Sequence, residues 1–177
     1  MSGPTVIVLA SGRGERFAAS GGVGHKLQAL LVGKTVLQYV LDAVLASGLP
    51  WHLEDSGQPG MGDSIAAAVA ATASASGWLV LPADLPLIRG ETLSAVASAL
   101  QQHTVVLPFY LGQRGHPVGF SATCRQELLE LKGDQGAAAV VRSYSTFELN
   151  VDDVGCVTDI DRLDDLKKAE QFLSMRR

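Results

Sequence analysis

Several features that mark particular protein classes are scarce or absent in this chain of 177 residues. Its two cysteines, Cys124 and Cys156, are too few for a disulfide scaffold and are typical of a reduced, cytoplasmic protein. No run of about 18 apolar residues occurs, so we expect no membrane span, and the first residues lack the pattern of a secretory signal. The net charge is −4 without a long basic run, which argues against a nucleic-acid-binding surface.

The composition is that of a folded domain with a hydrophobic core. Apolar residues make up 47% of the chain, and its length is close to that of one domain, so we expect residues 1–177 to form a single domain. Thr5–Leu9 and residues 78–81 are short apolar runs, which are typical of strands buried on both faces of a parallel sheet. We therefore expect both strands to lie inside the sheet and parallel to each other.

Strands alternate with helices along the rest of the chain, which predicts an α/β fold. A glycine-rich loop over residues 10–25 follows the first strand. Helices are expected at residues 36–45, 64–74, 93–100, 126–131, 136–144 and 163–172. Further strands are expected at residues 105–109, 117–120, 147–151 and 157–160.

The loop that follows the first strand combines glycine with positive charge. Gly12 and Gly14 allow backbone N–H groups to approach an anion, and Arg13, Arg16 and Lys26 add three cations. This combination suits a triphosphate. The loop matches neither of two common phosphate-binding motifs, because the last glycine of G-x-G-x-x-G is missing and no Ser or Thr follows Lys26. The alternative is a solvated loop with ordinary surface charges.

Carboxylates follow two of the predicted strands. Asp84 comes just after the second apolar strand, where ligands of α/β sheets bind, and can hold Mg²⁺. Alternatively, Asp84 caps a helix that has Pro86 in its first turn. Asp159 and Asp161 lie at the end of a predicted late strand and project to the same side, so either can supply a second metal ligand. The alternative for Asp161 is a helix cap formed together with Asp164.

We expect a turn at residues 114–117, where Arg114 and His116 could bind an anionic second substrate. The alternative is that both side chains are simply solvated. The sequence has neither an H-E-x-x-H motif nor paired C-x-x-C motifs, which argues against a zinc site.

Six segments, in order along nearly the whole chain, resemble the MobA-like nucleotidyltransferases. They are residues 9–16 followed by Lys26, then 60–64, 83–86, 114–117, 133–137, and 159–161 followed by 164–166. The last three are similar to the branch that contains molybdenum cofactor cytidylyltransferase. The resemblance implies a Rossmann-like, three-layer α/β/α fold with a mostly parallel sheet. It also implies an enzyme that transfers a nucleotide from a nucleoside triphosphate with Mg²⁺ and releases pyrophosphate.

The same resemblance implies roles for individual residues. Arg16, Lys26 and Asp84 would be catalytic, and Asp84 and Asp161 would bind Mg²⁺. The nucleotide would contact Leu9, Ala10, Ser11, Gly12, Arg13, Gly14, Gly62 and Ser64. The acceptor, by resemblance molybdopterin, would contact Arg114, His116, Asp134 and Gln135. The small residue Ser11, which is not glycine, favours CTP over GTP, and a molybdoenzyme or a maturation factor is a candidate partner.

The sequence departs from the family's pattern at residues 48–59. Family members have a strand, a helix and a second strand there, and twelve residues are too few for such a crossover. Either the sheet lacks one βα unit at that edge or the printed chain lacks a segment. Two rival functions stay open: transfer to a sugar phosphate or to methylerythritol phosphate, and nucleotide binding without catalysis.

Overall fold

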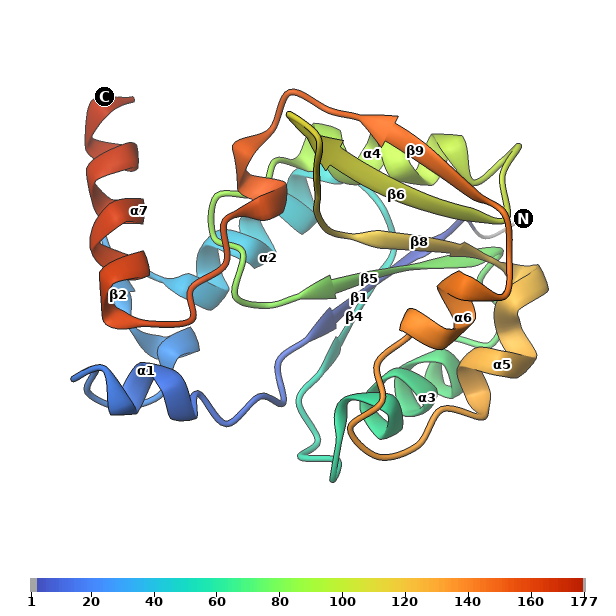
Figure 1. Ribbon diagram of the computed structural model, residues 1–177, viewed down its shortest axis with the longest axis horizontal. Helices are drawn as coiled ribbons and strands as arrows, with labels where there is room; N and C mark the ends of the chain where they lie inside the picture. The colour runs from blue at the N-terminus through green and yellow to red at the C-terminus, as the bar shows by residue number, and fades with distance from the viewer. Residues whose placement is uncertain (1–2, 177) are drawn as a thin grey trace.

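A seven-stranded sheet lies at the centre of the computed structural model, which describes residues 3–176 (Figure 1). Its strands are ordered β4 (Trp51–Glu54), β1 (Thr5–Leu9), β5 (Gly77–Pro82), β8 (Val118–Ser121), β6 (Val105–Tyr110) and β7 (Gln113–Arg114), and β9 (Thr146–Asn150) pairs with the opposite edge of β6. β4, β1, β5, β6 and β9 run in one direction, whereas β7 and β8 run antiparallel to them. The prediction of a mostly parallel sheet is confirmed.

β1 and β5 lie inside the sheet and parallel to each other, as their apolar sequences predict. The side chains of Val6 and Val8 enter one hydrophobic core, and that of Ile7 enters a second core. The reason is that successive side chains of a strand point to opposite faces of its sheet. A strand with both faces covered therefore needs an unbroken apolar run.

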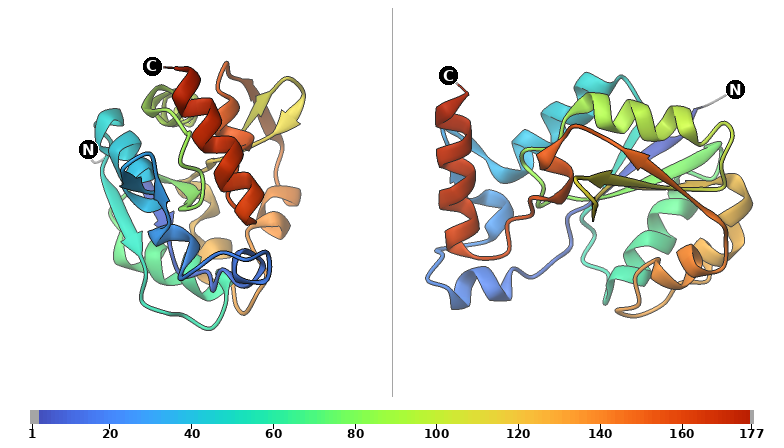
Figure 2. Two further views of the ribbon diagram at one scale, coloured as in Figure 1. Left: turned by 90° about the vertical axis from the view of Figure 1, so that its left-hand side faces the viewer. Right: turned by 45° about the horizontal axis from the view of Figure 1, so that its top comes forward.

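Helices cover both faces of the sheet and complete a three-layer α/β/α arrangement (Figure 2). α2 (Val36–Ser47) and α4 (Gly90–Ala99) pack on the face of Val6 and Val8. α3 (Met61–Ala71), α5 (Arg125–Leu129) and α6 (Ala138–Arg142) pack on the face of Ile7. The predicted Rossmann-like fold is confirmed. None of the helices within residues 3–176 is long and apolar enough to cross a membrane.

Short elements from both ends of the chain gather beyond the carboxyl end of β1 (Figure 1). They are α1 (Glu15–Ala19), a 3-10 helix at Lys26–Gln28, the hairpin of β2 (Leu30–Leu31) and β3 (Lys34–Thr35), and α7 (Leu163–Met175). The Leu163 N–H donates to the Ser20 hydroxyl oxygen at 2.8 Å, which joins the start of α7 to the end of α1. Two further 3-10 helices lie at Ala122–Cys124 and Val154–Val157.

Residues 48–59 contain a single strand and no helix. α2 ends at Ser47 and is followed by Gly48, whose φ of 71° suits glycine, and β4 begins at Trp51. In the described part of the chain β4 pairs with β1 only, so it forms an edge of the sheet. Residues 48–59 therefore hold one strand in place of the strand–helix–strand unit of the family's pattern.

Two predictions of local structure made from the sequence are wrong. The strand expected at residues 157–160 is absent, and Val154–Val157 form a 3-10 helix instead. Within this 3-10 helix Gly155 packs too closely against Leu87 to carry a Cβ, and its N–H donates to the Asp153 carboxylate at 2.9 Å. The loop expected over residues 10–25 is not irregular throughout, because α1 forms within it and buries Phe17.

Candidate functional site

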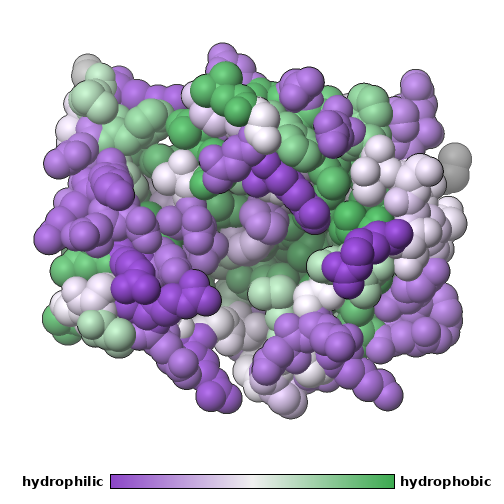
Figure 3. All heavy atoms as spheres, in the orientation of Figure 1, coloured by the Kyte–Doolittle hydropathy of each residue, from purple (hydrophilic) through white to green (hydrophobic). Residues whose placement is uncertain are grey.

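A cleft of about 610 Å³ lies at the carboxyl ends of β1 and β5, where loops leave the two strands. α1 and α3 lie on opposite sides of the end of β1, and Figure 3 shows a hollow on this face with hydrophilic side chains around it. The two walls differ in charge. The first, which we call the charged wall, is lined by Arg13, Glu15, Arg16, Lys26, Asp84 and Asp161. The second, which we call the uncharged wall, is lined by Gln58, Pro59, Gly60, Met61 and Ser64. Asp134 also lines the cleft, and its backbone packs against Gly60 at the border of this wall.

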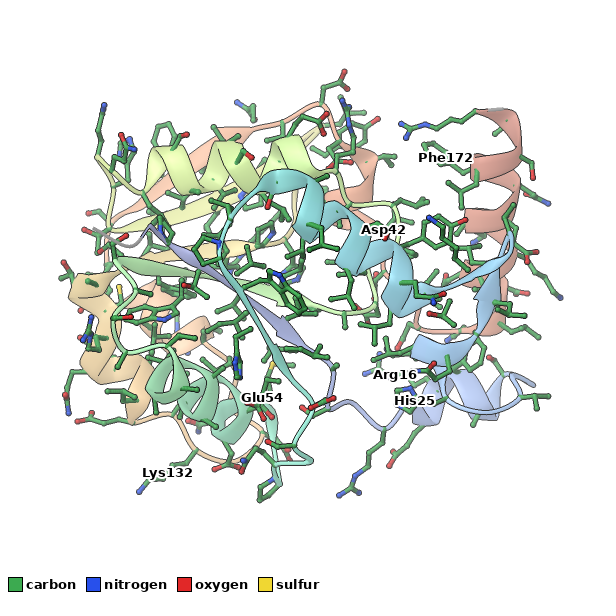
Figure 4. The ribbon with its side chains drawn as sticks, turned by 180° about the vertical axis from the view of Figure 1, so that it is seen from behind. Arg16, His25, Asp42, Glu54, Lys132 and Phe172 are labelled. Atoms are coloured by element: carbon green, nitrogen blue, oxygen red, sulfur yellow. The ribbon has the colours of Figure 1, made fainter. Side chains whose placement is uncertain are left out.

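The loop after β1 folds back on itself and returns Lys26 to the cleft. Gly14 has a φ of 66°, and a Cβ at this position would lie 3.5 Å from the Lys26 Cγ. His25 holds the loop closed, because its Nε2–H donates to the Gly12 carbonyl oxygen at 2.5 Å and its Nδ1 accepts from the Leu27 N–H at 3.2 Å. Figure 4 labels His25 beside Arg16 in this region. The sequence gives no signal for this role of His25.

Lys26 pairs with Asp84 in the cleft. The Lys26 Nζ lies 2.8 Å from the Asp84 Oδ2, and the two side chains are only 13% and 18% exposed. The other carboxylate oxygen, Oδ1, is buried and has no hydrogen-bond partner within residues 3–176. α4 begins at Gly90 and is preceded by Arg89, so the interpretation of Asp84 as a helix cap is wrong. Asp84 therefore presents an unsatisfied buried oxygen, a costly arrangement unless a ligand or cation completes it.

Arg16 pairs with Asp161 on the same charged wall. Their Nη1 and Oδ2 atoms lie 2.7 Å apart, and this hydrogen-bonded ion pair raises the pKa of Arg16. The N–H groups of Asp161 and Arg162 donate to the Asp165 carboxylate at 3.0 and 2.8 Å. The start of α7 is therefore capped at Arg162 by Asp165, and the predicted cap formed by Asp161 with Asp164 is wrong.

Asp159 and His116 lie near Asp84 but do not line the cleft. The Ile160 N–H donates to the Asp84 carbonyl oxygen at 2.8 Å and holds this segment in place. Burial, and then the charge of Asp84, raises the pKa of Asp159. Burial lowers the pKa of His116 although Asp84 acts in the opposite direction. Because no strand forms here, the alternation expected to align Asp159 with Asp161 does not apply.

Most of the predicted site residues meet in this cleft, while their roles stay predictions. Those that line it are Leu9, Ser11, Gly12, Arg13, Gly14, Arg16, Lys26, Ser64, Asp84, Asp134 and Asp161. Those that do not are Ala10, Gly62, Arg114, His116 and Gln135. Ser11 and Ser64 share a hydrogen bond of 2.9 Å that joins the loop to α3. Gly62 is buried, and a Cβ there would lie 2.6 Å from the Gln135 carbonyl oxygen, so it packs α3 against residues 132–135.

Several residues of the cleft are not among those singled out from the sequence. They are Glu15, Leu27, Gln58, Pro59, Gly60, Met61, Pro82 and Ala83. Their place in the sequence could have identified them, because each residue lies within or close to a segment that resembles the family. Gln58 and Pro59 directly precede the turn at residues 60–64.

Cations and carboxylates that share a cleft at the carboxyl edge of a parallel sheet are the groups that bind a polyphosphate together with a divalent metal. A sequence profile of the MobA-like NTP transferase domain matches residues 43–148, more than half of the chain. This chain belongs to the MobA-like NTP transferase family. The recognition made from the six segments is therefore confirmed, and the family is one of nucleotidyltransferases.

Similar proteins are consistent with this MobA-like assignment. The chain is 30% identical to the purine catabolism protein PucB of Bacillus subtilis (strain 168) over 128 residues, which are 71% of this chain and 60% of PucB. It thus spans about three fifths of that relative. The crystal structure of Rv0371c from Mycobacterium tuberculosis H37Rv matches with a TM-score of 0.78 and 25% identity, over 96% of this chain and 99% of that one.

Two further structures show the shared fold. A manganese complex of Rv0371c matches with a TM-score of 0.75 and 23% identity, over 96% of this chain and 98% of that one. Mth528, a nucleotidyl transferase from Methanothermobacter thermautotroptrophicus, matches with a TM-score of 0.81 and 18% identity over 100% of both chains. The fold of this MobA-like chain is therefore that of known nucleotidyltransferases, despite the short segment at residues 48–59.

Proposed function

We propose that this chain is a nucleotidyltransferase that uses a divalent metal to move a nucleotide from CTP, in preference to GTP, to the phosphate of molybdopterin. The observation that carries the proposal is the pairing of Lys26 with Asp84 in a cleft formed by a glycine-rich loop. The family and the fold support the class of reaction. The choice of CTP and of molybdopterin rests on the resemblance at Ser11 and at residues 114–117 and 133–137.

The charged wall is the proposed triphosphate site. Backbone N–H groups of residues 11–14 and the side chains of Arg13, Arg16 and Lys26 would bind the phosphate oxygens. Arg16 and Lys26 are each paired with a carboxylate in this structure. Binding of a triphosphate would therefore exchange these carboxylates for phosphate oxygens, which leaves Asp84 and Asp161 available to a cation.

Asp84 and Asp161 are the residues that would hold the divalent metal, Mg²⁺ in this proposal. The buried, unpartnered Oδ1 of Asp84 fits this role, and Asp161 lines the same wall. Within residues 3–176 no three His, Cys, Asp or Glu side chains are arranged so that they could hold a metal ion by themselves. Such a site suits a cation that takes its other ligands from phosphates and water, as Mg²⁺ does. When bound, the cation would supply charge neutralisation at the α-phosphate, and the manganese complex of Rv0371c supports a divalent metal.

In the proposed reaction an oxygen of the acceptor phosphate attacks the α-phosphorus of CTP. The bond from that phosphorus to the bridging oxygen breaks, and pyrophosphate leaves with the bonding electron pair. Lys26 and Arg16 would align the phosphates and neutralise the charge that develops on the leaving group. The protein need not remove a proton, because the second pKa of a phosphate monoester is about 6. Arg114, His116, Asp134 and Gln135 are proposed to contact the acceptor, and of these Asp134 lines the cleft.

Pyrophosphate release measured with each nucleoside triphosphate tests this proposal. The purified chain is incubated with Mg²⁺ and one of three acceptors: molybdopterin, a sugar phosphate or methylerythritol phosphate. We expect release with molybdopterin, fastest with CTP, and none when the acceptor or the metal is left out. The Lys34→Met variant is a suitable control, because Lys34 pairs with Asp42 outside the cleft.

The other outcomes replace parts of the proposal. Release with methylerythritol phosphate or a sugar phosphate, but not with molybdopterin, would give the enzyme a different acceptor. Tight nucleotide binding without release under any condition would favour a non-catalytic nucleotide-binding domain.

A further inference from the structure

Gln58 is the side chain of the uncharged wall best placed to recognise a ligand by hydrogen bonding. It lines the cleft and is half-buried. The other polar side chain of this wall, Ser64, is buried and hydrogen-bonded to Ser11. Pro59, Gly60 and Met61 offer no polar side-chain atoms other than the thioether of Met61.

Glu54, His52 and Ser56 form a chain of hydrogen bonds that ends at the amide group of Gln58. Glu54, labelled in Figure 4, lies at the end of β4 and is 4% exposed. Its carboxylate accepts hydrogen bonds from Ser56 and His52. Burial opposes ionisation of Glu54, but these hydrogen bonds outweigh it and lower its pKa. Glu54 is therefore a carboxylate, which can only accept hydrogen bonds.

The orientation of the Gln58 amide follows from this charge. The Ser56 hydroxyl has one proton, and it donates that proton to the Glu54 carboxylate. Toward Gln58, the Ser56 oxygen can then only accept, so the Gln58 amide nitrogen must face it, at 3.2 Å. Within residues 3–176 no group bonds to the remaining amide oxygen, Oε1. Gln58 thus offers a ligand an acceptor whose position is set by Ser56 and Glu54.

We propose that Gln58 selects the nucleobase, favouring one with an exocyclic amino group, such as cytosine, over uracil. This inference rests on the proposed function, because it requires the triphosphate to occupy the charged wall. The nucleoside then lies toward the uncharged wall, where Gln58 presents an amide oxygen. Asp134, whose backbone packs against Gly60 of this wall, is assigned to the acceptor in the proposed function. Cytosine carries an amino donor at the ring position where uracil carries an acceptor oxygen. With uracil, the carbonyl oxygen of the base would face the Oε1 of Gln58, and neither atom can donate a hydrogen bond. A mismatch of this kind lowers the affinity for the nucleotide by roughly tenfold or more.

Calorimetric titration with CTP, UTP and inorganic tripolyphosphate, each with Mg²⁺, tests the inference without depending on turnover. The proteins are the wild type, Gln58→Met, Ser56→Ala and a control, Gln101→Met, which changes an exposed residue outside the cleft. We expect the wild type and the control to bind CTP roughly tenfold more tightly than UTP. Gln58→Met should reduce this ratio to about threefold or less by weakening CTP. Ser56→Ala should reduce it by strengthening UTP, because the amide can then turn.

The affinity for tripolyphosphate distinguishes the role of Gln58 from the proposed function on which it rests. It should be the same in all four proteins, because the substitutions leave the charged wall unchanged. A wild type that binds CTP and UTP equally, or an unchanged ratio in Gln58→Met or in Ser56→Ala, overturns the role of Gln58 while the proposed function stands. A wild type that binds neither nucleotide overturns the proposed function itself. If Gln58→Met fails to fold, as judged by circular dichroism, Ser56→Ala decides the matter alone.

Discussion

The ion pair between Lys26 and Asp84 has a structural effect and a proposed catalytic effect that a double-mutant cycle separates. The variants are Lys26→Met, Asp84→Asn and the double variant. An exposed ion pair contributes at most about 1 kcal/mol, but these side chains are only 13% and 18% exposed and 2.8 Å apart. A charge-assisted hydrogen bond contributes roughly 1.5–3 kcal/mol. We therefore expect Lys26→Met to lower the free energy of unfolding by about 1–2 kcal/mol, and Asp84→Asn by less, because Asn keeps an acceptor oxygen.

The two effects should show opposite patterns in the cycle. For stability, the double variant should cost little more than Lys26→Met alone, because each change breaks the same contact. For turnover, Lys26 and Asp84 act on different groups, the triphosphate and the metal, so neither change can rescue the other. Each single variant should lose roughly 10²–10³-fold in pyrophosphate release, and Asp84→Asn should also require more Mg²⁺.

Urea unfolding and pyrophosphate release as a function of Mg²⁺ are the two assays. Lys34→Met is the matched control, because it breaks a pair of similar length, 2.7 Å, whose side chains are both 54% exposed. It should leave both measurements close to wild type. Turnover near the wild-type level in either single variant, or recovery in the double variant, would show that the pair is purely structural and would refute this account of the site.

Three further predictions concern other parts of the molecule. Arg16→Ala should raise the KM for the nucleotide about tenfold. It should leave the melting temperature within about 2 °C of wild type, because the ion pair of Arg16 with Asp161 is exposed. A large drop in melting temperature would indicate a structural role for Arg16. Gly62→Ala should lower the free energy of unfolding in urea by about 1–3 kcal/mol, because its Cβ would lie 2.6 Å from the Gln135 carbonyl oxygen. Gly12→Ala is the control, because a Cβ there would have no atom within 4 Å, and it should not destabilise the fold. Equal stabilities of the two variants would contradict this packing of Gly62. Burial raises the pKa of the Cys124 and Cys156 thiols to about 11, so a chromogenic thiol reagent at pH 8 should label them only after unfolding, and rapid labelling of the native protein would count against that burial.

Strands that are buried on both faces, and helices whose apolar residues recur at helical spacing, could be predicted from the sequence. β1 forms at Thr5–Leu9 as expected, because each of its faces packs against a hydrophobic core. β4 was not foreseen, because Trp51–Glu54 is short and half polar, as an edge strand can be. The strand expected at residues 157–160 is absent, because this segment is held by contacts with residues distant in sequence: Gly155 packs against Leu87, and the Ile160 N–H donates to the Asp84 carbonyl oxygen.

The residue types of the site were predictable, but their pairing was not. Glycines, cations and Asp84 stand in segments that resemble a family, and that resemblance placed them in one site. The partners of Lys26 and Arg16 lie 58 and 145 residues further along the chain, so only the folded structure reveals those ion pairs. The chain from Glu54 to Gln58 was missed for a different reason. Its residues are adjacent in sequence, but nothing in the pattern shows that β4 ends at the cleft.

The central claim, transfer of a nucleotide to a phosphate acceptor, is tested most directly by following the α-phosphorus of CTP. CTP labelled at the α-phosphate is incubated with the protein, Mg²⁺ and molybdopterin, and a parallel sample carries the label at the γ-phosphate. The account predicts that the α-label appears in the molybdopterin product and the γ-label in pyrophosphate, in equal amounts. Label that stays in CTP, or an α-label found only in free CMP, would contradict it.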